Sequence, residues 1–285
     1  MNNSIYPCLW FDGKAKEAAS FYCSIIKNSK ITTDTPMVVM FELGGKKFMG
    51  LNGGPMFTIN PSISIFILCE SINETNEVWN KLIDGGKALM PIDKYPWSER
   101  YGWLQDKFGL TWQVSVVNKA GDKQQITPSM LFTDKQFGRA EEAIKFYTSV
   151  FDNSSIDPLI HYPDGDPNAG KVMFAEFKLN QYPVIAMDGP GDHKYTFNEG
   201  VSFVVNCETQ KEIDYYWDKL TANGGEESMC GWLKDRFGVS WQIVPSFIGK
   251  LMSDKEKAPR VMEAVMKMKK LDIAKMLQAA EKEPA

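Results

Sequence analysis

The segment GWLQDKFGLTWQV at residues 102–114 recurs as GWLKDRFGVSWQI at residues 231–243, and this repeat decides the fold. Most of the aligned positions are identical and the others are mostly conservative, which chance does not produce. The similarity also extends to the start of each half, because PCLWFDGKAKEAASFYCSII at 7–26 is echoed by PSMLFTDKQFGRAEEAIKFYTSVF at 128–151. Repeated matches in the same order indicate an internal duplication.

Each half alternates segments typical of strands and of helices. In the first half we expect a strand at 7–11, a helix at 15–27, a hairpin over 38–51, a strand at 62–69, a second helix capped by Asn73, and closing strands up to 116. The sequence therefore predicts an α+β protein of two modules, residues 1–117 and 126–248, joined by a polar linker at 118–125. Residues 249–285 carry apolar side chains at near-helical spacing among charged ones and predict a helical tail.

Composition limits the class of protein and of partner. The chain has 285 residues, a formal net charge of -4 and no basic stripe, which argues against nucleic-acid binding. No apolar run is long enough to span a bilayer, and the N-terminal residues lack the features of a signal peptide, so we expect a cytoplasmic protein with no membrane partner. Five cysteines without ligand spacing are expected to be reduced thiols: Cys8, Cys23, Cys69, Cys207 and Cys230.

One segment is present in the first half only. Residues 91–100 (PIDKYPWSER) have no counterpart in the second half. A loop confined to one half is either a lip of a functional site or a tolerated surface insertion, and the sequence leaves both interpretations open.

With the strand-helix start at 7–27 and the DKFGLTWQ motif at 106–113, the sequence resembles the PhnB-like branch of the glyoxalase/bleomycin resistance (vicinal oxygen chelate) superfamily. That branch is also labelled 3-demethylubiquinone-9 3-methyltransferase-like. The resemblance covers both modules and the tail, including RVMEAVMKMKKLDI at 260–273. It implies tandem βαβββ modules that form a curved, mostly antiparallel cup for a small molecule or metal ion.

The metal ligands that the resemblance implies are not in place. The superfamily usually holds a divalent metal with His or Gln on the first strands and Glu near the last strands. The corresponding positions are Ile5 and Thr127 on the first strands and Gln113 and Gln242 on the last strands. Neutral amides alone make a poor site for a hard dication. We therefore predict no cofactor, although Glu42 or Glu176 could supply a carboxylate to a divalent metal.

Other polar residues have ordinary structural interpretations. His161 and His193 lie in polar loops and are expected at the surface, where Asp164, Asp166 or Asp192 could join them in a metal site. Asp106 and Asp235 are equivalent by the repeat and are expected to stabilise the turn before the last strand. The PhnB-like branch often has a His in the second strand, but the aligned residues here are the apolar Val38 and Phe174.

These observations favour a metal-independent protein that binds a small, partly apolar molecule in a cup between the modules. The tryptophans predicted to form its walls are Trp10, Trp103, Trp112, Trp232 and Trp241, and the predicted hydrogen-bonding groups are Gln113 and Gln242. Two alternatives are a metal-dependent lyase, isomerase or dioxygenase, and a scaffold without a ligand. A methyltransferase is disfavoured because no glycine-rich nucleotide-binding turn is found. Whether catalysis occurs is left open, and the tail could support a homodimer.

Overall fold

The computed structural model describes residues 4–117 and 123–281. The first half contains β1 (Ile5–Phe11), α1 (Ala15–Ile25), β2 (Lys30–Asp34), β3 (Val38–Leu43), β4 (Lys46–Asn52), β5 (Ile63–Cys69), α2 (Ile72–Leu82), β6 (Lys87–Tyr95), β7 (Ser98–Gln105) and β8 (Thr111–Val116). The first half consists of two successive βαβββ units and the second half repeats them with one additional short strand, so the α+β architecture of tandem βαβββ modules is confirmed.

The second half repeats the plan with β9 (Gln125–Phe132), η1 (Asp134–Gln136), α3 (Ala140–Val150), β10 (Ser155–Ile156), β11 (Ile160–His161), β12 (Val172–Leu179), β13 (Tyr182–Asp188), β14 (Val201–Cys207), α4 (Gln210–Thr221), β15 (Glu226–Glu227), β16 (Trp232–Lys234) and β17 (Ser240–Pro245). The tail forms α5 (Ile248–Ser253), α6 (Ala258–Val265) and α7 (Ile273–Glu281). Of the expected linker, residues 118–122 lie outside the described residues, as do the last four residues of the tail.

Local expectations failed where the apolar pattern is weak. The sequence did not predict β2 and did not distinguish β6, which includes part of the expected loop at 91–100. Both strands lie at sheet edges and are largely exposed, so alternating apolar residues do not mark them. Ser71, not Asn73, caps α2, and its hydroxyl accepts a hydrogen bond from the Glu74 amide at 3.2 Å.

The two halves share both sheets. The first sheet has the strand order β15-β16-β17-β14-β1-β4-β3-β2, and the second has the order β10-β12-β13-β9-β5-β8-β7-β6. Antiparallel pairing of β1 with β14 joins the halves in the first sheet, and antiparallel pairing of β5 with β9 joins them in the second. Each sheet therefore takes one βαβββ unit from each half.

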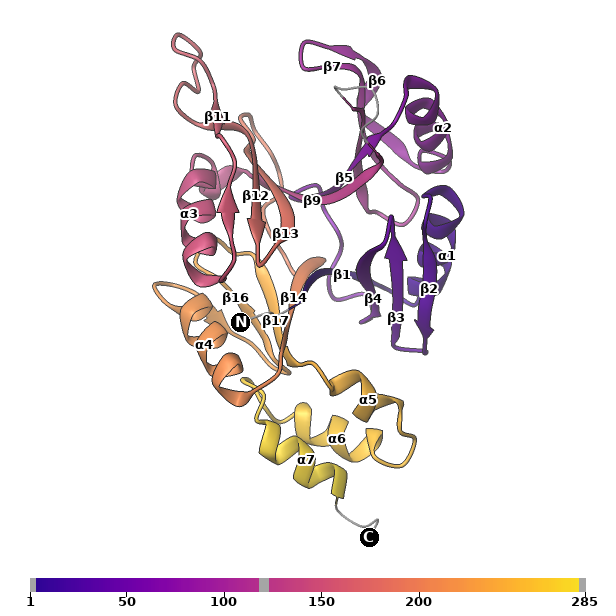
Figure 1. The fold of residues 1–285 in the computed structure, drawn as a ribbon, viewed down its shortest axis with the longest axis vertical. Coiled ribbons are helices and arrows are strands. Elements are labelled where there is room, and N and C mark those ends of the chain that lie inside the picture. Colours follow the sequence, from indigo (N-terminus) through magenta and orange to yellow (C-terminus); the bar gives the residue numbers. More distant parts are fainter. Residues whose placement is uncertain (1–3, 118–122, 282–285) are drawn as a thin grey trace.

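The helices of the two halves lie outside the sheets, with α1 and α2 on one side of the molecule and α3 and α4 on the other (Figure 1). The sheet face under these helices is filled by the main apolar core. We call the opposite face of each sheet its cup face. The hairpin β6–β7 and strand β11 rise at one end of the molecule, and α5–α7 lie at the other end (Figure 1).

Two buried carboxylates fasten the strand ends under the helices. Asp106 accepts hydrogen bonds from the Phe108 amide at 2.8 Å and from the Trp112 indole at 2.8 Å. Asp235 makes the equivalent bonds to Phe237 and Trp241 at the same distances. The predicted role of both aspartates in the turn before the last strand is confirmed.

The tail packs against the cup face of the first sheet. Val261, Val265 and Leu271 are buried there in one apolar cluster with Tyr6 and Cys8. Since burying one such side chain contributes roughly 1.5–3 kcal/mol, this contact accounts for much of the attachment of the tail.

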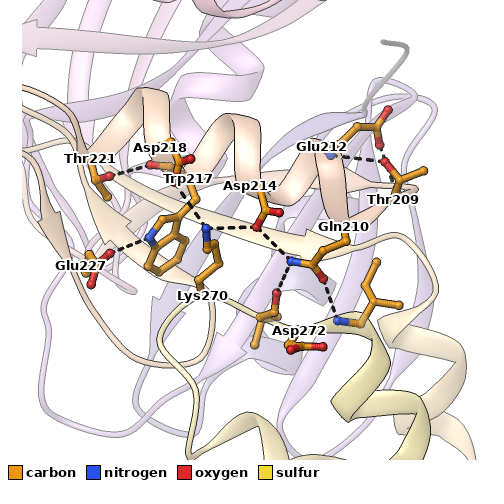
Figure 2. Close-up of polar contacts among 12 residues, drawn as sticks. Thr209, Gln210, Glu212, Asp214, Trp217, Asp218, Thr221, Glu227, Lys270 and Asp272 are labelled. Carbon is orange, nitrogen blue, oxygen red and sulfur yellow. Dashed lines mark hydrogen bonds and ion pairs between the residues drawn. The ribbon is translucent and has the colours of Figure 1, made fainter.

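Polar contacts with α4 fix the position of residues 270–273 of the tail. The Gln210 side chain donates to the Leu271 carbonyl at 3.0 Å and accepts from the Ile273 amide at 2.9 Å (Figure 2). The Lys270 ammonium lies 3.0 Å from Asp214 and 3.4 Å from Asp218 (Figure 2). The chain between α6 and α7 is therefore attached by side chains of α4 as well as by apolar burial.

Candidate functional site

The cup face of the second sheet encloses a cavity of about 540 Å³. Strands from both halves of the chain form its walls, because β5, β7 and β8 belong to the first half and β9, β12 and β13 to the second. Its volume lies within the range of small-molecule sites. The wall is mainly apolar, and its apolar members include Leu68, Met90, Val116, Leu131, Met173 and Met187.

Four aromatic rings form a continuous row along this wall, which we call the aromatic row: Trp97, Tyr101, Phe66 and Phe174. Successive ring centroids are 5.7, 6.3 and 6.4 Å apart. Such spacings allow favourable ring contacts. The row begins at the exposed turn between β6 and β7, crosses β7 and β5, and ends on β12, so it connects the mouth of the cavity with the opposite wall.

Gln113 is the central polar group of the wall, and its amide is bonded within the protein. The Tyr101 hydroxyl donates to Oε1 at 2.8 Å, and Nε2 donates to the hydroxyls of Ser64 at 2.8 Å and Ser129 at 3.3 Å. Burial raises the pKa of Tyr101 above its ordinary value, which keeps the hydroxyl protonated and donating. The amide is thereby held in one orientation in the wall.

Most other polar groups of the wall also have partners. Asp188 accepts hydrogen bonds from the amides of Gly138, Ala140 and Val172 at 2.8–3.2 Å. His193 Nε2 lies 3.0 Å from the Pro190 carbonyl oxygen, which can only accept, so this nitrogen carries the proton.

Two polar groups of the wall are different. The indole N–H of Trp103 is buried and has no acceptor among the described residues. The Glu176 carboxylate makes no hydrogen bond or ion pair within the described part of the chain. Glu176 is an exposed residue of β12, and partial loss of water around its carboxyl, followed by the charge of Asp157, raises the pKa of this group, whereas Lys178 opposes the shift. Both groups are left available to a ligand.

The first sheet carries a related polar group that the tail covers. Gln242 corresponds to Gln113 in the repeat and donates to the Ser202 hydroxyl at 3.0 Å. Cys8 lies beside Gln242 and Ser202, and burial raises its pKa to about 12. Cys8 also belongs to the apolar cluster that the tail completes. The two cup faces are therefore related in sequence, but the tail occupies only that of the first sheet.

The structure divides the seven predicted site residues into three groups. Trp103 and Gln113 line the cavity. Trp10 and Trp232 lie together on the first sheet, with ring centroids 5.9 Å apart, and Gln242 lies on the same sheet. The Trp10 indole donates to the Gly54 carbonyl at 2.7 Å and packs against Phe57. Trp10, Trp232 and Gln242 therefore lie on a different sheet from Trp103 and Gln113.

The prediction that Trp112 and Trp241 line a cup is wrong. Both are buried in the core under the helices, where their indoles donate to Asp106 and Asp235. Each precedes a cup-face glutamine by one residue, and adjacent strand residues point to opposite faces. Trp112 and Gln113, or Trp241 and Gln242, therefore cannot both face the same ligand.

The residues at the centre of the cavity do not suit a divalent metal ion. Gln113, Ser64 and Ser129 offer only neutral donors, and their hydrogen bonds to one another already use them. Among the described residues there is no group of three or more His, Cys, Asp or Glu side chains that could hold a metal. Ile5, a position implied by the resemblance, packs in the core under the helices.

The remaining metal candidates are scattered. Glu42 pairs with Lys30 at 3.4 Å on the first sheet and does not line the cavity. His161 Nε2 lies 3.0 Å from a Glu141 oxygen on α3. Asp192 pairs with Lys194 at 2.7 Å. His193, expected at the surface, instead lines the cavity.

None of the four rings of the aromatic row was among the predicted site residues. Trp97 lies in the segment found only in the first half, and its position at the mouth favours the lip interpretation of that segment. Phe66 was treated as an ordinary strand residue, and Phe174 only as the apolar residue aligned with the second-strand His of the PhnB-like branch. The available signal was alternation, because Phe66 shares a face of β5 with Ser64, which bonds the central Gln113.

Comparisons with known proteins agree with this architecture. The model of the family described as 3-demethylubiquinone-9 3-methyltransferase matches residues 3–115 and 124–244. No curated protein matches the chain significantly. A PhnB protein from Bacillus cereus is 35% identical, with 39% of this chain and 96% of that chain covered and a TM-score of 0.37.

Glyoxalase I from Zea mays is similar over most of the chain, with 89% of this chain and 97% of that chain covered, a TM-score of 0.56 and 12% identity. At this identity the likeness concerns the fold alone. The family match, in contrast, spans both halves. The chain therefore belongs to the family described as 3-demethylubiquinone-9 3-methyltransferase.

Proposed function

We propose that this protein binds a small, largely apolar molecule in the cavity of the second sheet, without a metal ion. The observation that carries this proposal is the cavity of about 540 Å³, with its aromatic row and the buried amide of Gln113. A mainly apolar wall supplies affinity through burial, and a few fixed polar groups supply orientation. A buried polar group held by several hydrogen bonds keeps its position when the ligand enters.

Methyl transfer, which the family description names, has less support. The strands of the described residues pair both parallel and antiparallel in two curved sheets, with no repeated alternation of parallel strands and helices. That alternation forms the common dinucleotide-binding crevice. A lyase, isomerase or dioxygenase that uses a metal is disfavoured by the neutral donors around Gln113.

Location and assembly remain predictions. No helix in the described part of the chain is long and apolar enough to cross a membrane. We expect the protein in the cytoplasm, and the five unpaired cysteines agree with a reducing compartment. The homodimer is not needed to complete the cavity, because both walls come from one chain; light scattering after gel filtration would measure the assembly state.

The direct test is titration with N-phenyl-1-naphthylamine, a neutral dye whose fluorescence rises in apolar sites. We expect saturable binding at one site, together with a rise in the melting temperature, since a ligand of the native state stabilises it by mass action. Phe66→Ala should weaken binding by removing part of the aromatic row. The matched control is Phe48→Ala, which removes a fully buried ring under the helices of the first sheet.

Binding that survives Phe66→Ala and is lost in Phe48→Ala would place the dye elsewhere. Metal dependence is measured on the same protein by adding Mn²⁺, Ni²⁺ or Zn²⁺ after chelation. We expect no selective rise in melting temperature. A stoichiometric, selective shift would favour the metal-dependent alternative.

A further inference from the structure

The ligand's charge can be inferred from the charged groups of the cavity wall. Among the described lining residues, the formally charged side chains at neutral pH are Glu176 and Asp188, and neither Lys nor Arg is present. The Asp188 carboxylate is occupied by three backbone amides. Glu176 is thus the charged group that the wall leaves for a ligand.

The position of Glu176 relates it to the aromatic row. It lies on β12 two residues after Phe174, the last ring of the row, and alternate residues of a strand share a face. Lys178 is the next residue on this face, and Asp157 is close enough to act on the Glu176 carboxyl. These two neighbours have opposite charges, so together they do not neutralise Glu176.

A ligand's effect on this carboxylate depends on its charge. A neutral apolar ligand removes water from the Glu176 carboxylate without replacing the lost hydrogen bonds, whereas an anionic ligand also repels the carboxylate. A cation pairs with the carboxylate and is also attracted by the face of an aromatic ring, and Phe174 shares this face of β12 with Glu176. The combination of an unpaired carboxylate with a neighbouring aromatic ring therefore favours positive charge.

We propose that the cavity selects organic cations, with the apolar body of the ligand against the aromatic row and its positive group beside Glu176. This inference rests on the proposed function and specifies its ligand class. An aromatic or aliphatic amine, or a quaternary ammonium compound, of a size that fits about 540 Å³ meets these requirements. Gln113 contributes a fixed wall in this arrangement rather than a charge.

Three probes of nearly the same shape test the proposal: 1-methylquinolinium, which is cationic, 1-methylnaphthalene, which is neutral, and 1-naphthoate, which is anionic. Their affinities are measured by displacement of N-phenyl-1-naphthylamine. We expect the cation to bind about 3- to 10-fold more tightly than the neutral probe, the range that one cation–π contact and a partly exposed ion pair provide. The anion should bind most weakly.

Glu176→Gln keeps the size of the side chain and removes its charge. We expect this variant to lose the preference for the cation and to bind the neutral probe as before. The matched control is Asp157→Asn, which removes a nearby negative charge that does not line the cavity. It should retain the preference, because the proposal requires a carboxylate in the wall.

The outcomes separate this inference from the proposed function. Neutral and cationic probes that bind equally well would overturn the cation preference and leave the binding function standing. A preference that survives Glu176→Gln would also overturn the inference. If neither the dye nor any of the three probes binds, the proposed function itself fails.

Discussion

Trp103 and Trp112 lie on neighbouring strands and face opposite sides of the second sheet, so the same substitution should have opposite effects at the two positions. In the register of β7 and β8, Trp103 is paired with Gln113, and Leu104 is paired with Trp112. We predict that Trp112→Phe lowers stability and leaves binding intact. Trp103→Phe should weaken binding and change stability little.

The magnitudes follow from the contacts. Trp112→Phe removes the 2.8 Å hydrogen bond to the buried Asp106 carboxylate, worth about 1.5–3 kcal/mol, and leaves a small void in the core. We expect the free energy of unfolding to fall by about 2–4 kcal/mol. Trp103 has no hydrogen-bond acceptor to lose, so Trp103→Phe should cost under about 1 kcal/mol.

Binding is predicted from apolar area. Replacing the Trp103 indole by a benzyl group removes about 40 Å² of wall, or about 1 kcal/mol of burial, which corresponds to a roughly fivefold loss of dye affinity. Urea unfolding measures stability through the shift of the midpoint at constant slope. Titration with N-phenyl-1-naphthylamine measures affinity on the same preparations.

The internal repeat offers a control in the same molecule. Trp241 donates to Asp235 at 2.8 Å in the second half, so Trp241→Phe should destabilise the protein by a similar amount. Weaker dye binding by Trp112→Phe at unchanged stability would contradict the placement of Trp112 in the core. A larger loss of stability in Trp103→Phe than in Trp112→Phe would contradict the placement of Trp103 in the cavity wall.

Three other perturbations test the packing and the buried charges. Gly102→Ala places a Cβ 2.4 Å from the Trp79 ring and should lower the free energy of unfolding, measured in urea, by about 1–3 kcal/mol. Gly249→Ala has open space around the new Cβ and should cost nothing, so equal effects of the two substitutions would contradict the packing. Leu271→Ala removes a fully buried apolar side chain of the tail and should weaken the attachment of the tail by about 2–4 kcal/mol. Limited proteolysis after residue 247 should then be faster. Unchanged cleavage would show that Leu271 does not hold the tail. Burial raises the pKa of Asp235 to about 6 from 3.8, so the contribution of this carboxyl to stability is full below about pH 4 and is lost as the pH rises through 6. Carbon NMR of the carboxyl should show a titration midpoint near 6. A midpoint below 4 would mean that the four hydrogen-bond donors to Asp235 outweigh its burial.

Much of the fold was predictable because the duplication doubles the evidence for each element. The repeated segments at 102–114 and 231–243 place a turn and a last strand in both halves, and the turn roles of Asp106 and Asp235 followed from that equivalence. The strands that were missed are exposed edges. They bury few side chains, so their formation depends on a neighbouring strand more than on their own sequence.

The site was only partly predictable because the sequence of a strand does not show which of its two faces will line the cup. Gln113 and Trp112 are adjacent, and either could have faced a ligand until the helices of the fold covered one side. Trp97 belongs to a segment whose role no pattern could decide. It became part of the wall because the β6–β7 hairpin stands at the mouth of the cavity.

The sequence by itself determined the duplication, the family and the neutral amides of Gln113 and Gln242 at equivalent positions of the two repeats. These depend on residue identity and on matches along the chain. Only the tertiary structure decided that β1 pairs with β14 and β5 with β9, so that each cup face draws on both halves, and that the tail covers one cup face while the other keeps its cavity. Both results depend on contacts between residues far apart in the chain, which are set by the burial of apolar surface as a whole and which no local pattern records.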